Sequence, residues 1–214
     1  TLQAQAGKSY EIVIEFKQIK DGAYFNFDLV EDIPLNMNAT LEKLKDTEIV
    51  IFAGGISPLL EGEEMKVSAA GFKGGDRTDI ELPAVQRNVL AALKKAGKKV
   101  IFVNFSGSAM ALTPETENCD AILQAWYPGQ EGGTAVADVL FGDYNPAGRL
   151  PVTFYKNMEQ LPDFEDYSMQ GRTYRYMKEA PLFPFGYGLS YTTFTYGKAR
   201  ADKKRISTGE KMTL

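Results

Sequence analysis

The sequence predicts an α/β fold in which helices cover a mostly parallel sheet. Three short apolar runs, residues 48–53, 99–104 and 120–126, show no alternation of polar and apolar side chains, as expected of parallel strands covered on both faces. Residues 82–96 lie between the first two runs and show helical spacing, and a second such segment, residues 134–141, follows the third run. This order of strands and helices is typical of a layered α/β domain.

The helices are predicted from their periodicity and from the residues at their ends. In residues 82–96 the apolar side chains recur at helical spacing, Pro83 suits the first turn, and Gly97 suits a helix end. Residues 134–141 place their apolar side chains on one face. A shorter helix is predicted at residues 41–46.

Other segments have the period of strands. Residues 10–16 and 23–30 alternate around an Asp21-Gly22 turn and predict a hairpin, which either docks as an edge or belongs to a truncated domain. Residues 150–155 predict one further edge strand, because Pro151 lacks the N–H that a central strand needs. The long aromatic segment that follows is typical of a functional loop or of a loop that wraps another surface.

Composition excludes several classes of function. The chain of 214 residues has a formal charge of −4 and a sequence pI near 5.1, so neither nucleic acid nor a membrane is an expected partner. It contains no histidine and one cysteine, which excludes Ser-His-Asp and Cys-His catalysis within the chain and the usual zinc sites. We therefore expect no metal and no cofactor, and acid/base chemistry falls to carboxylates, tyrosine or lysine.

A carboxylate-rich loop follows the first apolar run. Glu61, Glu63 and Glu64 lie within four positions, and repulsion between their charges raises the pKa of at least one of them, as a general acid requires. The alternative is a solvated acidic loop without a catalytic role. Further on, Asp76 and Arg77 either bind sugar hydroxyls or form a structural pair.

Aromatic side chains are frequent in the second half of the chain. They could stack on sugar rings, although aromatic residues more often pack against one another. The candidates are Trp126, Tyr127, Phe164, Tyr167, Tyr174, Tyr176, Phe183, Phe185 and Tyr187.

Several motifs, in the right order, resemble the C-terminal α/β-sandwich domain of glycoside hydrolase family 3, in particular its bacterial β-xylosidases and β-glucosidases. They are LEGEEM, GGDRTDIELP, AILQAWYPGQEGGTAVADVLFGDYNPAGRLPVTFY, DYSMQGRTYRY and PLFPFGYGLSYTTF. The resemblance implies a three-layer α/β sandwich over residues 35–193, with about six strands in a mostly parallel sheet and flanking β segments. Residues 1–34 resemble a β-hairpin remnant of a PA14-like domain, and residues 194–214 resemble the start of a fibronectin type III-like domain.

The resemblance also implies an activity, that of an exo-acting retaining β-glycosidase on terminal sugars of plant-type oligosaccharides. In the family an N-terminal (β/α)₈ barrel supplies an Asp nucleophile, and the sandwich domain supplies the acid/base Glu, the second of an E-x-E pair. Here that position is Glu63. Because residues 64–75 separate this pair from Asp76-Arg77, Glu61 and Glu64 remain alternatives.

Further expectations follow from the resemblance. Without the barrel the chain is expected to be inactive, and the whole enzyme is expected to be periplasmic or secreted, although this N-terminus has no signal peptide. The sequence does not distinguish glucose, xylose and arabinose as the preferred sugar. The competing hypothesis is a non-catalytic carbohydrate-binding or scaffolding module.

Overall fold

The computed structural model describes residues 5–15, 34–62, 65, 67, 69–74 and 76–214. The chain divides into two compact units, Thr1–Asn36 and Met37–Leu214. In the first unit, residues 10–15 are assigned to no strand, and the second arm of the predicted hairpin, residues 23–30, lies outside the described residues. Among the described residues, the helices and strands all belong to the second unit.

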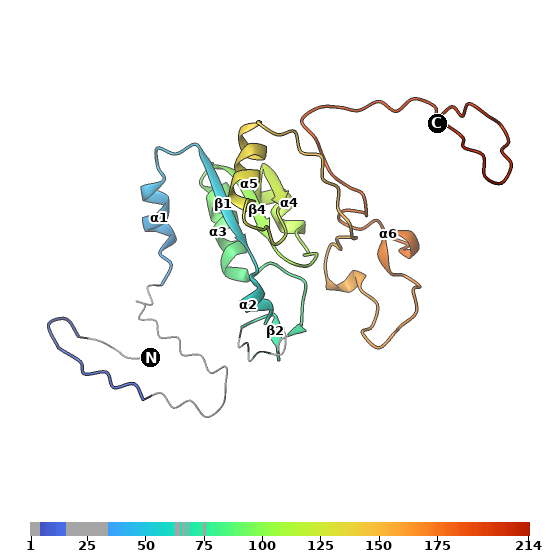
Figure 1. Ribbon diagram of the computed structural model, residues 1–214. Coiled ribbons are helices and arrows are strands. Elements are labelled where there is room, and N and C mark those ends of the chain that lie inside the picture. Colours follow the sequence, from blue (N-terminus) through green and yellow to red (C-terminus); the bar gives the residue numbers. More distant parts are fainter. Residues whose placement is uncertain (1–4, 16–33, 63–64, 66, 68, 75) are drawn as a thin grey trace. The chain divides into compact units, whose positions relative to one another are not determined.

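The centre of the second unit is a parallel sheet (Figure 1). Its strands are β1 (Ile49–Gly55), β4 (Lys99–Phe105) and β5 (Ala121–Gln124), in the order β1-β4-β5. β4 is parallel to both neighbours, which confirms the α/β class and the mostly parallel sheet. The described residues form three strands in this sheet, fewer than the six expected, and a separate two-residue antiparallel pair, β2 (Phe72–Lys73) and β3 (Asp76–Arg77).

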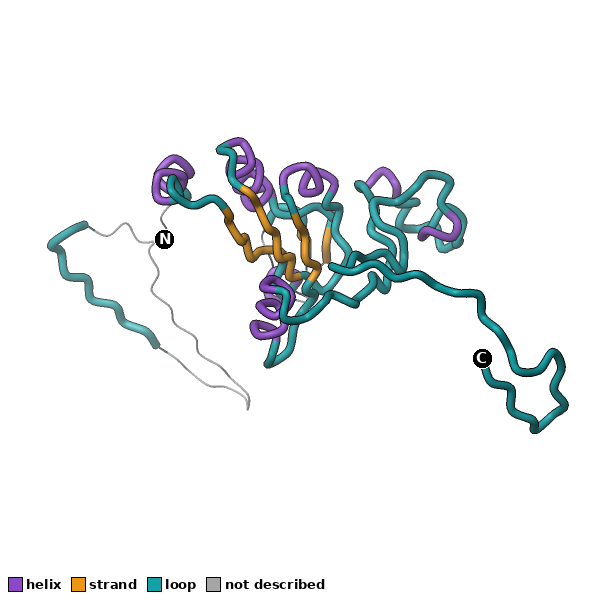
Figure 2. The backbone as a smooth tube through the Cα atoms, turned by 90° about the horizontal axis from the view of Figure 1, so that it is seen from above, coloured by secondary structure: helices purple, strands orange, loops and turns teal. Residues whose placement is uncertain are grey.

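Helices lie on both sides of the sheet (Figure 2). They are α1 (Met37–Lys43), α2 (Pro58–Glu61), α3 (Ala84–Lys95), α4 (Thr113–Asn118), α5 (Gly132–Phe141), the 3₁₀ turn η1 (Met158–Gln160) and α6 (Thr173–Tyr176). The predicted helices at 82–96 and 134–141 are confirmed as α3 and α5, and the short predicted helix begins earlier than expected, as α1. Within the described part of the chain, every helix is too short or too polar to span a membrane.

The core lies between α3 and one face of the sheet. Leu90 and Leu93 of α3 are buried together with Val100 and Phe102 of β4. These strand positions alternate with residues of the opposite face, so one face of β4 packs on the helix. The apolar residues that recur at helical spacing in α3 therefore form a buried face, as their periodicity predicts. Packing of this face on β4 holds the sheet against α3.

β1 departs from the expected burial on both faces. Its side chains at positions 50 and 52 pack against the core, whereas Ile49 and Ile51 on the other face are 51% and 48% exposed. β1 has a hydrogen-bonded neighbour on one side only, and no helix among the described residues covers this part of its outer face. An apolar run without alternation therefore did not distinguish an edge strand from a central one.

The predicted strand at residues 150–155 is replaced by irregular pairing with a later segment. Phe154 and Phe183 exchange backbone hydrogen bonds of 2.8 and 3.1 Å in an isolated antiparallel bridge, and Leu150 N donates to Tyr187 O at 2.8 Å. Pro151 lacks an N–H and interrupts a regular ladder here. Phe154 is nevertheless buried, so the segment closes one end of the core.

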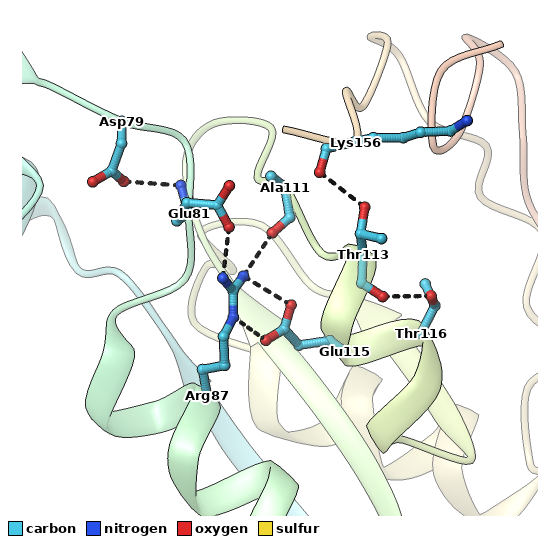
Figure 3. A network of polar contacts seen from close by, with 8 residues as sticks. All are labelled: Asp79, Glu81, Arg87, Ala111, Thr113, Glu115, Thr116 and Lys156. Atoms are coloured by element: carbon cyan, nitrogen blue, oxygen red, sulfur yellow. Dashed lines mark hydrogen bonds and ion pairs between the residues drawn. The ribbon is translucent and has the colours of Figure 1, made fainter. Parts of the chain in front are cut away.

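A buried ion pair joins α3 to α4, a helix that the sequence did not predict (Figure 3). The Glu115 side chain is fully buried and accepts from Arg87 Nε at 2.7 Å and from Arg87 Nη2 at 3.1 Å. Arg87 also donates to Glu81 Oε2 at 2.6 Å and to the Ala111 carbonyl at 3.0 Å. One guanidinium group therefore connects α3, α4 and the segments before each helix.

We predict that Arg87→Met lowers the free energy of unfolding by about 3 to 5 kcal/mol, because it leaves the buried Glu115 carboxylate without its partner. Lys94→Met is the matched control, since Lys94 pairs with Asp120 at 3.1 Å in an exposed position and should cost under about 1 kcal/mol. Urea unfolding followed by circular dichroism measures both variants. Equal, small losses for the two variants would contradict a stabilising role for the buried pair.

A second prediction concerns Cys119, which is buried at the end of α4. Burial raises the pKa of its thiol to about 12, helped by the nearby Glu115 carboxylate. The folded chain thus binds this proton more tightly than the unfolded chain, so the stability that this group contributes is complete below about pH 9 and declines as the pH rises from there towards 12.

At about pH 8 the native chain should therefore react with a disulfide reagent roughly 1,000-fold more slowly than the urea-unfolded chain, because far less Cys119 is thiolate. Absorbance of the released reagent thiol measures both rates. Similar rates in the two states would show that the thiol is accessible and ordinary.

Candidate functional site

The site lies at the carboxyl edge of the parallel sheet, where α/β folds bind their ligands. The chain leaves β1 at Gly55, β4 at Phe105 and β5 at Gln124. Each exit leads within a few residues to a side chain of one cluster: Glu61 after β1, Ser108 after β4 and Tyr127 after β5. The parallel order of the strands therefore brings together residues that are far apart in the sequence.

The first exit is fixed by close contact between β1 and β4. Ile56 N donates to Phe105 O at 2.8 Å, and a Cβ at Gly55, whose φ is +122°, would lie 1.9 Å from that oxygen. Only glycine fits this position. Gln86 of α3 completes the junction, since its amide accepts from Gly55 N and donates to Gly55 O, both at 2.7 Å.

The one-turn helix α2 then presents Glu61. Its N-cap is Ser57, whose Oγ accepts from Leu60 N at 3.2 Å, with Pro58 in the first helical position. Its C-cap is Gly62, which has φ +54° and ψ +50° and donates its N–H to Pro58 O. Glu61 is therefore the last residue of a helix with a defined start and a defined end.

Both carboxylate oxygens of Glu61 accept hydrogen bonds from other segments. Ser108 Oγ donates to Oε1 at 2.7 Å, and Tyr127 Oη donates to Oε2 at 2.5 Å. Arg77 Nη1 in turn donates to Ser108 Oγ at 2.9 Å and to Ala109 O at 3.3 Å. Glu61, Ser108, Tyr127 and Arg77, here called the Glu61 cluster, connect the three strand exits with β3.

Tyr127 reaches Glu61 through unusual local geometry. The preceding Trp126 has φ +57°, a conformation that non-glycine residues rarely adopt, and a Cβ at Gly107 would lie 2.4 Å from the Tyr127 ring. Removal from water and the Glu61 carboxylate raise the pKa of Tyr127 to about 12, while a backbone hydrogen bond from Gly107 acts in the opposite direction. The phenol is therefore protonated at neutral pH and remains a hydrogen-bond donor.

Buried polar side chains support the turn that contains Ser108. Asn104 Nδ2 donates to Gln124 Oε1 at 2.6 Å, and Gln124 Nε2 donates to Ser106 Oγ at 3.0 Å. Ser106 Oγ, fully buried, donates to Ser108 O at 2.9 Å. The linked side chains of Asn104, Gln124 and Ser106 restrict this segment and hold Ser108 in place, while Asn104 Oδ1 is buried without a hydrogen-bond partner among the described residues.

The structure brings some of the predicted site residues together and leaves others apart. Glu61 and Arg77 both belong to the cluster, whereas Glu63 and Glu64 lie outside the described residues. Asp76 is exposed and its neighbour Arg77 is half-buried, because adjacent residues of a strand such as β3 point to opposite faces. Burial lowers the pKa of Arg77, and the Glu61 and Asp79 carboxylates raise it, so the cation compensates this acidic edge.

An open pocket of about 310 Å³ adjoins the cluster. Most of its lining surface is apolar. The lining residues are Gly54, Gly55, Ile56, Ser57, Pro58, Gln86, Phe105 and Tyr127. Among the described residues, no group of three or more acidic or cysteine side chains could bind a metal ion. The described side chains of the cluster offer a carboxylate, a hydroxyl, a phenol and a guanidinium group.

The sequence alone does not connect Ser108 and Tyr127 with the acidic loop. Their contacts with Glu61 span 47 and 66 positions and depend on strand order. The available signal was that Ser57, Ser106 and Tyr127 follow the three apolar runs within four residues.

Four of the nine aromatic residues considered as sugar platforms stack on one another in two pairs. Tyr174 stacks on Phe185 with ring centroids 5.6 Å apart, and Phe183 stacks on Tyr187 at 4.7 Å. Trp126 meets the buried Phe154 edge to face. Phe164 and Tyr167, both 91% exposed, pack least.

Relatives with similar sequences are glycosidases. A xylan 1,4-β-xylosidase of Xylanibacter ruminicola is 63% identical over 202 residues, which cover 94% of this chain and 23% of that protein. A periplasmic β-glucosidase of Salmonella typhimurium is 44% identical over 149 residues, 64% of this chain and 20% of that protein. The chain thus spans less than a quarter of the length of these relatives.

Solved structures agree with the sequences. A β-glucosidase of Kluyveromyces marxianus in complex with glucose matches 73% of this chain and 19% of its own with a TM-score of 0.60 and 31% identity. An exo-β-xylosidase in complex with a xylobiose aziridine probe matches 73% of this chain and 20% of its own, with a TM-score of 0.61 and 31% identity. Residues 2–191 match the family model described as the glycosyl hydrolase family 3 C-terminal domain, and the chain belongs to this family.

Proposed function

We propose that the chain is the sandwich domain of an exo-acting retaining β-glycosidase and that its loop after β1 supplies the catalytic acid/base, Glu63. The observation that carries the proposal is the Glu61 cluster, which anchors the start of a carboxylate-rich loop at the ligand-binding edge of the sheet. The names of the relatives, β-xylosidases and β-glucosidases, support this reaction and this class of substrate.

The reaction has two steps with one covalent intermediate. A nucleophilic carboxylate attacks the anomeric carbon as the bond to the leaving oxygen breaks, and the acid/base Glu donates its proton to that oxygen. The same Glu, now ionised, takes a proton from water, whose oxygen attacks the anomeric carbon and releases the nucleophile and the sugar. The acid/base must therefore have an oxygen free to face the substrate.

This requirement distinguishes the three candidate glutamates. Both oxygens of Glu61 already accept hydrogen bonds, so its role is structural. Glu63 follows Gly62, the residue that ends α2, and it is the second member of the E-x-E pair. Glu64 is the remaining alternative, and the exposed Asp76 is the proposed contact for sugar hydroxyls.

The rest of the active site comes from other parts of the same polypeptide. Because the chain spans 23% of the xylosidase relative, an N-terminal (β/α)₈ barrel is the proposed source of the nucleophile and of most of the sugar pocket. On this proposal the chain alone is inactive. Residues 1–34 and 194–214 are proposed as PA14-like and fibronectin type III-like segments, and the enzyme as periplasmic or secreted.

The test is Glu63→Ala in the full-length protein, compared with Glu61→Ala and Glu64→Ala. For an acid/base we expect kcat on aryl β-xylosides and β-glucosides with poor leaving groups to fall about 10²- to 10⁴-fold. Azide should restore turnover of activated aryl glycosides for Glu63→Ala alone, because azide attacks the covalent intermediate without a general base. Kinetics and detection of the glycosyl azide measure the outcome.

Two results would contradict the assignment. Azide rescue of Glu64→Ala or Glu61→Ala instead would move the acid/base to that residue. Absence of glycosidase activity in the full-length protein, with the fold intact by circular dichroism, would favour a non-catalytic binding module.

A further inference from the structure

The contact between Tyr127 and Glu61 depends on two positions that tolerate few residues. Trp126 has a positive φ, which in a bulky residue costs free energy unless the surroundings enforce it. Gly107 leaves the space that the Tyr127 ring fills, since a Cβ there would lie 2.4 Å from ring carbon Cε2. The backbone conformation of Trp126 and the space at Gly107 thus direct the Tyr127 hydroxyl towards Glu61.

The second donor to Glu61 is equally well supported. Ser108 receives a hydrogen bond from Arg77 at 2.9 Å, and its carbonyl accepts one from the buried Ser106 at 2.9 Å. Its hydroxyl proton is therefore left for Glu61 Oε1 at 2.7 Å. Ser108 is half-buried, and Tyr127, although 39% exposed, has its ring against Gly107 and its hydroxyl on Glu61, so the two donors together define the position of the Glu61 carboxylate.

Helix α2 needs this support because of its length. It has four residues, Pro58–Glu61, and a single turn has little stability of its own. Glu61 is its last residue, and Glu63 is only two positions further, within about 8 Å along the chain. A shift of Glu61 therefore moves the point from which the acid/base residue extends.

We propose that Tyr127 and Ser108 are positioning residues for glycoside hydrolysis, which act by binding the carboxylate of Glu61 and so fixing the loop that bears Glu63. This inference rests on the proposed function. It also assigns Arg77 to the anchor, through Ser108, instead of to the sugar. Tyr127 transfers no proton in this scheme, since its pKa of about 12 keeps the phenol protonated.

The experiment compares Tyr127→Phe with wild type in the full-length enzyme. Because small misplacements of a catalytic group are costly, we expect kcat on aryl glycosides with poor leaving groups to fall about 10- to 100-fold with little change in KM. Azide should not restore turnover, since the acid/base is present. Tyr191→Phe is the matched control, because its hydroxyl also donates a short hydrogen bond, 2.5 Å to Val139 O, away from this cluster.

The decisive measurement is the double variant. In the Glu63→Ala background, Tyr127→Phe should change kcat by less than about 2-fold, since a residue that acts through Glu63 loses its effect when Glu63 is removed. Gly107→Ala is a second route to the same loss, because it displaces the Tyr127 ring and keeps the hydroxyl. Thermal unfolding of each variant separates lost activity from lost fold.

The possible failures are distinguishable. Full activity of folded Tyr127→Phe, or a loss that is unchanged in the Glu63→Ala background, would overturn the positioning role and leave Glu63 as the acid/base. Azide rescue of Glu61→Ala would overturn it differently, by making Glu61 itself the acid/base. An inactive full-length wild-type protein would refute the proposed function.

Discussion

The close approach of β1 and β4 at Gly55 and Phe105 is the constraint on which the site depends. A Cβ at Gly55 would lie 1.9 Å from Phe105 O, so the two strands can leave the sheet together only if this residue is glycine. Gln86 then binds both backbone groups of Gly55 and couples the junction to α3. The short distance between Glu61 and Ser108 follows from this shared exit.

The fold was largely predictable because its signals are local. Helix α3 combines apolar periodicity with a proline at its start and a glycine after its end, and the three parallel strands are short apolar runs. The predictions failed where the outcome depends on which elements lie next to a segment in the fold, because the local sequence pattern contains no information on them. The half-exposed outer face of β1 depends on what lies beside it, and α4 contains few apolar residues because its buried member, Glu115, is charged and paired with Arg87.

The site was predictable only in part. Position after a strand was enough to select the acidic loop, and the crowding of three carboxylates was enough to suggest chemistry there. The partners of Glu61 were not predictable, since Ser108 and Tyr127 meet it only through the order β1-β4-β5. Strand order is a property of the whole sheet, and single-sequence periodicity contains no information on it.

Arg77 and Arg87 both bind the segment that follows β4, so this segment serves stability and the site together. After β4 the chain runs through Ser108 to Ala111, and Arg77 donates to Ala109 O while Arg87 donates to Ala111 O. Arg87 is paired with the buried Glu115, whereas Arg77 belongs to the Glu61 cluster. The buried pair stabilises one end of the segment, so the other end can present Ser108 to Glu61 with little freedom. Precision at the sheet edge thus depends on an ion pair inside the fold.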